Sequence, residues 1–229
     1  MKVYQVILTG KDHPFSGGAM GIYSVSQGMD EADINEITEK YASGRYYDKP
    51  IDDEIYPYYS FFKLNSGRYC IFSGRFIDDE KENYILHGLI LDEGIWPFYP
   101  VQIIGSPVFN YEADFLSNDV LELPVLDSVQ EGNAVTIENT SEFIKTRMDY
   151  GYDEMIAAVL EYHESNKPVV IRNSYDSLGF WIASIQMAFP LQIAHNISFS
   201  IWDCFTRDDD AVIQWLDNNL FSVRVSNED

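Results

Sequence analysis

Short apolar stretches, rich in aromatic and branched side chains and with a few polar positions among them, dominate the first half of the chain. Stretches of this kind, bounded by Gly, Pro, Asn or Asp, are typical of β-strands. They predict strands over residues 2–9, 20–26, 58–64, 68–74 and 84–91, and a further short strand over 101–104. The connection Asn65-Ser66-Gly67 predicts a tight hairpin, with Gly67 where a positive φ is needed.

A helical spacing first occurs after Asp30, a residue type that favours the N-cap. Ile34, Ile37 and Tyr41 recur at helical intervals, and Gly44 predicts the end of this helix. This is the single helix expected in the first half of the chain.

The pattern changes after residue 126 and becomes richer in helices. Capping residues Ser141, Asp153 and Ser177 each precede an apolar helical spacing, and a last helix is predicted over 211–220. Short strands are predicted over residues 135–137, 169–171, 196–202 and 221–225. Strands that alternate with helices in this way favour a small α/β unit.

Together these patterns predict an α+β protein. Its N-terminal half, residues 1–130, is mainly antiparallel β with one helix, and residues 131–229 form a helix-rich α/β region. Because no long linker separates the halves, one shared core and two separate cores both fit the pattern.

Charge is the strongest feature of the composition. The 229 residues include 15 Lys and Arg against 37 Asp and Glu, a net charge of −22. Phosphate backbones and anionic lipids bind positive surfaces, so the composition argues against nucleic-acid and membrane-surface binding. It leaves open simple solubility, a basic protein partner and mimicry of DNA.

Several observations predict a reduced, cytoplasmic protein. No apolar run approaches the roughly 18 residues of a membrane span, and the N-terminus has no small-residue cleavage site. The two cysteines, Cys70 and Cys204, lie in apolar runs and are expected to be buried thiols.

Motifs for metal, nucleotide and nucleophile chemistry are not found in the sequence. The histidines and cysteines lack zinc-site spacing, and neither a Walker-type loop nor a Gly-x-Ser-x-Gly elbow is present. The acidic runs 52–54, 78–80 and 208–210 are expected to be solvated loops. We therefore predict no metal, no cofactor and no catalytic residue.

One polar group of residues lies on or beside the predicted strands: Arg68, Arg75, Asn83 and His87. His87 shares a strand face with Ile85 and Leu89, which fits a hydrogen-bonded core histidine, and a general base is the alternative. Arg75 could pair with a loop carboxylate, or grip an anionic ligand or a carboxylate of a partner.

An aromatic segment interrupted by prolines follows these strands. Its rings are Trp96, Phe98 and Tyr99. Pro97 follows Trp96 and Pro100 follows Tyr99, and these prolines exclude a regular strand. The rings could pack as a lid on the core or be exposed anchors of an interface, where Trp and Tyr are common.

Several segments, taken in order, resemble the N-terminal domain of the bacterial GTPase-associated protein 1 family. They are residues 21–29, the hairpin 58–75 with Leu64-x-x-Gly67-Arg68-Tyr69, and 83–90 leading into 96–100 and 105–106. Phe189-Pro190 followed by residues 197–200 is similar to the start of that family's middle domain. Family members have Gly-Arg-x-Gly-Asn before the histidine strand, whereas here residues 76–82 separate Arg75 from Asn83.

The resemblance implies an adaptor, not the enzyme, in a GTPase-centred bacterial conflict or defence system. Family members are longer, so the chain is expected to be an N-terminal piece or a short member. We therefore expect a non-catalytic module that binds a protein partner, with a GTPase among the candidates, through Arg75, Asn83, His87 and the 96–99 rings. The alternatives are a hydrolase or transferase using His87 with Arg75 and Asn83, and an acidic DNA mimic.

Overall fold

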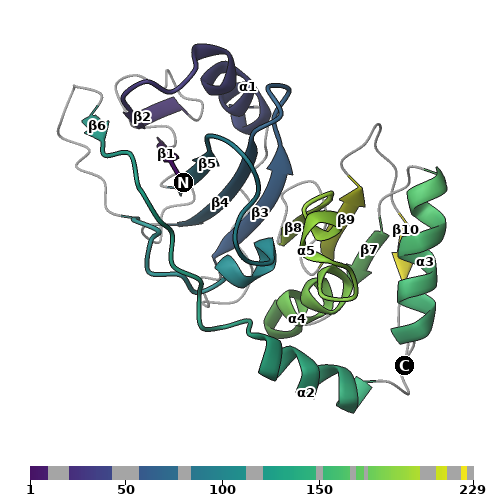
Figure 1. Cartoon of the computed structure of the whole chain (residues 1–229). Helices are drawn as coiled ribbons and strands as arrows, with labels where there is room; N and C mark the ends of the chain where they lie inside the picture. Colours follow the sequence, from purple (N-terminus) through teal and green to yellow (C-terminus); the bar gives the residue numbers. More distant parts are fainter. Residues whose placement is uncertain are drawn as a thin grey trace. The chain divides into compact units, whose positions relative to one another are not determined.

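The computed structural model (Figure 1) describes ten stretches of the chain. They are residues 1–9, 21–42, 57–76, 84–111, 121–147, 152–165, 169–172, 175–201, 210–215 and 223–225. Strands dominate the first half and most helices follow later, which confirms the predicted α+β class. The chain divides into two compact units: Met1–Tyr59, Lys63–Gly94 and Val108–Val129 form the first, and Ser60–Phe62, Ile95–Pro107 and Gln130–Asp229 the second.

The first unit contains five neighbouring strands of a sheet, in the order β4-β5-β1-β2-β6. The strands are β1 Val3–Thr9, β2 Gly21–Ser26, β4 Tyr69–Phe76, β5 Tyr84–Leu91 and β6 Leu121–Leu123. All neighbours are antiparallel except β2 and β6, which are parallel. The sequence predicted four of these five strands. It did not predict β6, which is only three residues long.

The predicted hairpin joins β3, Tyr58–Lys63, to β4. The backbone N–H of Leu64 donates to the carbonyl of Arg68 at 2.9 Å, and Gly67 has a φ of 89°. Glycine adopts this left-handed conformation without a Cβ clash, so the turn forms where the sequence predicts it.

One face of this sheet is covered by α1, Glu31–Ala42, shown in purple in Figure 1. Asp30 caps the helix as predicted, because its Oδ1 accepts a 2.8 Å hydrogen bond from the N–H of Ala32. Ile37 and Tyr41 are fully buried, and the Tyr41 ring lies 4.9 Å from that of Phe72 on β4. Cys70 on β4 is also buried, and Cys204 lies outside the described residues.

A close contact under α1 requires a glycine in β5. Phe72 and Gly88 are directly paired across β4 and β5. A Cβ built on Gly88 would lie 2.2 Å from Cε1 of Phe72, far inside van der Waals contact. The Phe72 ring therefore lies on the Gly88 backbone, and only glycine leaves room for it.

The opposite face of the sheet carries an unusual number of polar residues. The strand register places Ser24, Ile7, His87 and Ser73 in one row across β2, β1, β5 and β4, and directly opposed residues share a face. We call this the polar face. A bulge between Ile7 and Leu8 adds Tyr23, which packs with Ile7 and Ile85.

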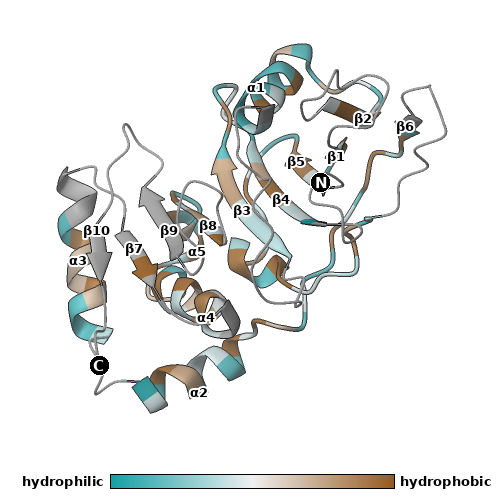
Figure 2. Cartoon of the chain, turned by 180° about the vertical axis from the view of Figure 1, so that it is seen from behind, coloured by the Kyte–Doolittle hydropathy of each residue, from teal (hydrophilic) through white to brown (hydrophobic). Residues whose placement is uncertain are grey.

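The second unit combines short strands with most of the helices. Its elements are η1 Pro100–Ile103, α2 Ile137–Arg147, α3 Tyr152–Ser165, β7 Val169–Arg172, α4 Tyr175–Gln186, α5 Leu191–Ala194, β8 Ile197–Ile201, β9 Asp210–Trp215 and β10 Val223–Val225. The strand order is β10-β7-β9-β8, with β10 parallel to β7 and the other pairs antiparallel. Brown, apolar positions are visible on α4 in Figure 2, in keeping with the burial of its Leu178, Ile182 and Ile185.

A buried glutamine fastens α4 to its neighbours. Gln186 accepts a 3.0 Å hydrogen bond from the N–H of Val101 through Oε1 and donates a 3.1 Å bond to the carbonyl of Ile197 through Nε2. The side chain is fully buried, so it satisfies backbone groups that no water could reach. No helix within the described stretches has the length and apolar character needed to span a bilayer.

The short strands predicted over residues 101–104 and 135–137 are wrong. In both places hydrogen bonds that cap a helix determine the local structure, although the residues have β propensity. Residues 100–103 form the 3₁₀ helix η1, in which Tyr99 N–H donates to Gln102 Oε1 at 3.0 Å. Residues 135–137 lead into α2, where Thr136 and Asn139 each accept a hydrogen bond from the other's backbone N–H through their side chains. Thr136 therefore caps a helix that begins before Ser141.

The helix predicted over residues 211–220 is wrong over residues 211–215, and residues 216–220 lie outside the described residues. Residues 210–215 form β9, which pairs with β7 on one side and β8 on the other. Val212, Ile213 and Trp215 favour a strand, and two hydrogen-bonded neighbours decide the conformation where periodicity over so few residues is ambiguous.

Candidate functional site

The predicted site residues fall into two separate groups. Arg75 and His87 lie on the polar face of the first unit, with Arg75 paired to Ile85 and His87 to Ser73. Asn83 lies outside the described residues. Trp96, Phe98 and Tyr99 belong to the second unit.

The aromatic segment is packed into the core of the second unit. Trp96 is 0% exposed, Phe98 is 4% exposed, and their ring centroids are 5.8 Å apart. Tyr99 is half-buried, and its hydroxyl donates a 3.1 Å hydrogen bond to the carbonyl of Phe189. Trp96 and Phe98 are therefore a lid on the core, and the alternative that they are exposed interface anchors is wrong.

His87 belongs to a hydrogen-bonded network on the polar face. It is 1% exposed, and its Nδ1 accepts a 2.9 Å hydrogen bond from the N–H of Asn110. The proton is therefore on Nε2, which lies 3.1 Å from Gln5 Oε1 and donates to it. Gln5 Nε2 in turn donates to the carbonyl of Pro124 at 2.6 Å, and Ser26 Oγ donates to the same carbonyl at 3.1 Å.

This environment keeps the imidazole of His87 neutral, with a hydrogen bond at each ring nitrogen. Burial lowers the pKa of His87 to about 4, because desolvation disfavours the charged ring. A general base needs a free nitrogen within reach of a substrate, and both nitrogens of His87 are engaged inside the unit. The geometry therefore supports the core-histidine interpretation and gives no support to catalysis by His87.

Arg75 lies on the same face, next to the last residue of β4, and is exposed. Its guanidinium carbon is 4.4 Å from the centroid of the Tyr111 ring, a close cation–π contact. The Tyr111 hydroxyl is 2.5 Å from Oγ of Ser73, which is fully buried on β4. Burial raises the pKa of Tyr111 well above its ordinary value, so the phenol stays protonated. We call Arg75 and Tyr111 the arginine–tyrosine pair.

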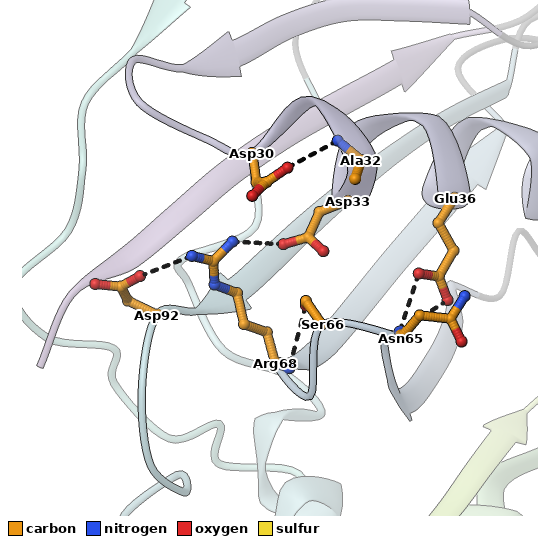
Figure 3. A network of polar contacts seen from close by, with 8 residues as sticks. All are labelled: Asp30, Ala32, Asp33, Glu36, Asn65, Ser66, Arg68 and Asp92. Atoms are coloured by element: carbon orange, nitrogen blue, oxygen red, sulfur yellow. Dashed lines mark hydrogen bonds and ion pairs between the residues drawn. The ribbon is translucent and has the colours of Figure 1, made fainter.

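Arg68 joins a second polar network, drawn in Figure 3. Its guanidinium lies between two carboxylates, with Nη1 2.6 Å from Asp33 Oδ2 and Nη2 3.4 Å from Asp92 Oδ1. Asp33 is 1% exposed although it is charged. The hydrogen bond to Asp33 raises the pKa of Arg68, while burial opposes this. The N–H of Asn65 donates one bifurcated hydrogen bond to the two carboxylate oxygens of Glu36. α1 therefore holds the hairpin turn through Asn65 as well as through the Arg68–Asp33 pair.

Beside this network the surface forms a cleft of about 340 Å³. Its lining residues are Asp30, Ser66, Gly67, Arg68, Leu91, Asp92, Glu93 and Gly94. The one guanidinium in this lining is engaged by Asp33 and Asp92, so the network works as a structural tie between α1, the hairpin turn and the end of β5. Among the described residues, no group of three His, Cys, Asp or Glu side chains could hold a metal ion.

Asp33, Gln5 and Tyr111 are among the residues of these networks that the sequence analysis did not name. Asp33 carried a usable signal, because it lies on the same helical face as Ile37 and Tyr41, and a charge on a buried face needs a partner. Gln5 lies at a core-facing position of β1 and carried a weaker signal of the same kind. Tyr111 carried none, because it follows no periodic pattern.

Comparison with protein families, with curated proteins and with solved structures gives no match to this chain.

Proposed function

We propose that this chain is a non-catalytic module that binds a protein partner, and that the arginine–tyrosine pair contacts that partner. The observation that carries the proposal is the exposed guanidinium of Arg75 over Tyr111, 4.4 Å from the ring centroid. Arg and Tyr are among the residue types that contribute most to binding energy in interfaces. His87, the candidate base of the competing catalytic interpretation, is engaged at both ring nitrogens and so gives that interpretation no support.

Preorganisation is the physical reason that this arginine suits an interface. A free arginine side chain loses rotamer entropy when it binds, at a cost of about 0.5–1.5 kcal/mol. The cation–π contact, about 0.5–1 kcal/mol for an exposed pair, orders the side chain before binding. Ser73 anchors Tyr111 from the core, so the ring is itself held in place.

A GTPase is a candidate partner on the strength of the family resemblance in segments 21–29, 58–75 and 83–106. That family is associated with bacterial systems in which an adaptor works beside a GTPase. This is consistent with an acidic chain that lacks nucleotide-binding motifs of its own. We carry the partner class over as a proposal, together with a cytoplasmic location.

The test is affinity capture from the native host with the wild-type chain, Arg75→Ala and a matched control. Arg147→Ala is the control, because Arg147 is also an exposed arginine over a ring, 5.8 Å from the centroid of Phe143. We expect a partner that the wild type and Arg147→Ala retain and Arg75→Ala loses. Equal recovery by all three proteins, or recovery of nothing above background with or without GTP, would refute the proposal.

A further inference from the structure

We infer that Arg75 receives a single carboxylate of the partner, from a partner surface that is basic as a whole. This inference rests on the proposed function and adds the chemistry of the partner. It starts from the position of the guanidinium, whose central carbon lies 4.4 Å from the centroid of the Tyr111 ring, on an exposed arginine. A guanidinium has five N–H donors, and a ring on one side of it leaves donors for a partner on the other. A carboxylate matches such donors with two parallel hydrogen bonds.

The charge of the chain favours a carboxylate over a phosphate. A phosphate group carries about two negative charges at neutral pH, and its sites are usually built from clustered arginines. Here one guanidinium lies on Tyr111, in a chain whose net charge is −22. The field of that charge repels a dianion more strongly than a monoanion. Binding a carboxylate at Arg75 therefore costs less electrostatic free energy than binding a phosphate, and one guanidinium has enough donors for it.

The same field decides what surrounds that carboxylate. A chain with 37 acidic against 15 basic residues attracts positive surfaces and repels negative ones. An acidic partner would be repelled before Arg75 could pair with its carboxylate. The partner surface is thus expected to be rich in Lys or Arg and to present one Asp, Glu or chain-terminal carboxylate to Arg75.

Two lysine-rich peptides of equal length test this inference, one with a central glutamate and one with glutamine in its place. Non-specific attraction to an acidic chain favours the glutamine peptide, because it is more positive. A carboxylate site at Arg75 favours the glutamate peptide, so the two explanations predict opposite orders. Binding is measured by fluorescence anisotropy at fixed salt with wild type, Arg75→Ala, Arg75→Lys and Arg147→Ala.

We expect the wild type and Arg147→Ala to prefer the glutamate peptide by about threefold, the size of an exposed charge pair. In Arg75→Ala the order should reverse, and Arg75→Lys should lose most of the preference because an ammonium lacks the planar fork. A preference of the wild type for the glutamine peptide, an unchanged order in Arg75→Ala, or no saturable binding would overturn the inference. Capture of the host partner could still depend on Arg75 in those cases, so the two proposals fail separately.

Discussion

The imidazole of His87 and the side-chain amide of Gln5 join neighbouring strands through a 3.1 Å hydrogen bond inside the polar face. Around them, backbone groups of Asn110 and Pro124 bind the same two side chains. The network therefore fastens the segments that carry Asn110 and Pro124 onto the sheet. Because Tyr111 follows Asn110 directly, this network also positions the ring on which Arg75 lies.

His87 should make the protein less stable as the pH falls. Its pKa is about 4 in the folded protein, against an ordinary value of 6.5, so the unfolded chain takes up the proton first. Stability is therefore lost as the pH falls from about 6.5 to about 4, by on the order of 3 kcal/mol from this group alone. Urea unfolding of wild type and His87→Gln across this range measures the effect.

Burial also lowers the pKa of His195, so part of the acid sensitivity should remain in His87→Gln. The informative quantity is the difference in pH slope between the two proteins, because the substitution also removes packing. An identical slope in both would show that His87 is not held neutral by its surroundings.

Gly88→Ala should destabilise the protein by about 1–3 kcal/mol, because the new methyl group overlaps the buried Phe72 ring. The Phe72 ring cannot move away freely, since the Tyr41 ring packs against it. Phe72→Leu should absorb part of this cost by making room. Thermal unfolding of the two single variants and the double variant gives the coupling energy, and strictly additive effects would contradict the overlap.

The sequence predicted those parts of the fold that depend on patterns within one element. The strands β4 and β5 follow from short apolar runs bounded by turn residues, and the cap at Asp30 follows from local capping, both of which neighbours in the chain decide. β9 could not be predicted in this way, because its two strand partners, β7 and β8, lie elsewhere in the chain. Its short apolar run fits a helix or a strand equally until those partners are known.

The candidate site also has a part that the sequence could predict and a part that it could not. Arg75 and His87 could be placed on adjacent strands from the hairpin pattern alone. What each side chain does depends on Tyr111 and Asn110, in a segment with no periodicity. Trp96 is buried by packing within the second unit, and the neighbouring residues Pro97 and Pro100 do not indicate that burial. The sequence could therefore name the candidate residues, but it could not assign their roles, because those roles depend on contacts with residues far away in the chain.

Arg68→Ala should cost about 2 kcal/mol of stability, because it leaves the Asp33 carboxylate buried with a lost partner. Asp33→Asn in the same chain should recover part of this loss, since an amide is cheaper to bury than a charge. Urea unfolding of the single and double variants measures both effects. Lys145→Ala is the control, because its pair with Glu142 is 70% exposed on both sides and should contribute nothing measurable.

Substitution of Tyr111 should separate the role of its hydroxyl from that of its ring. Tyr111→Phe removes the partner of the buried Ser73 hydroxyl, so we expect a loss of about 1–3 kcal/mol in stability. It keeps the ring under Arg75, so capture of the partner should persist under conditions in which the variant is folded. Tyr111→Leu removes the cation–π contact as well, and capture should fall towards the level of Arg75→Ala.

Urea unfolding followed by capture at equal amounts of folded protein measures both quantities. If Tyr111→Phe lost capture as completely as Tyr111→Leu, the hydroxyl and not the ring would be the group that matters. If both variants kept full capture, Tyr111 would not position Arg75 at all. The predicted result, retention by Tyr111→Phe and loss by Tyr111→Leu, would assign the ring as the platform that holds the guanidinium for its partner.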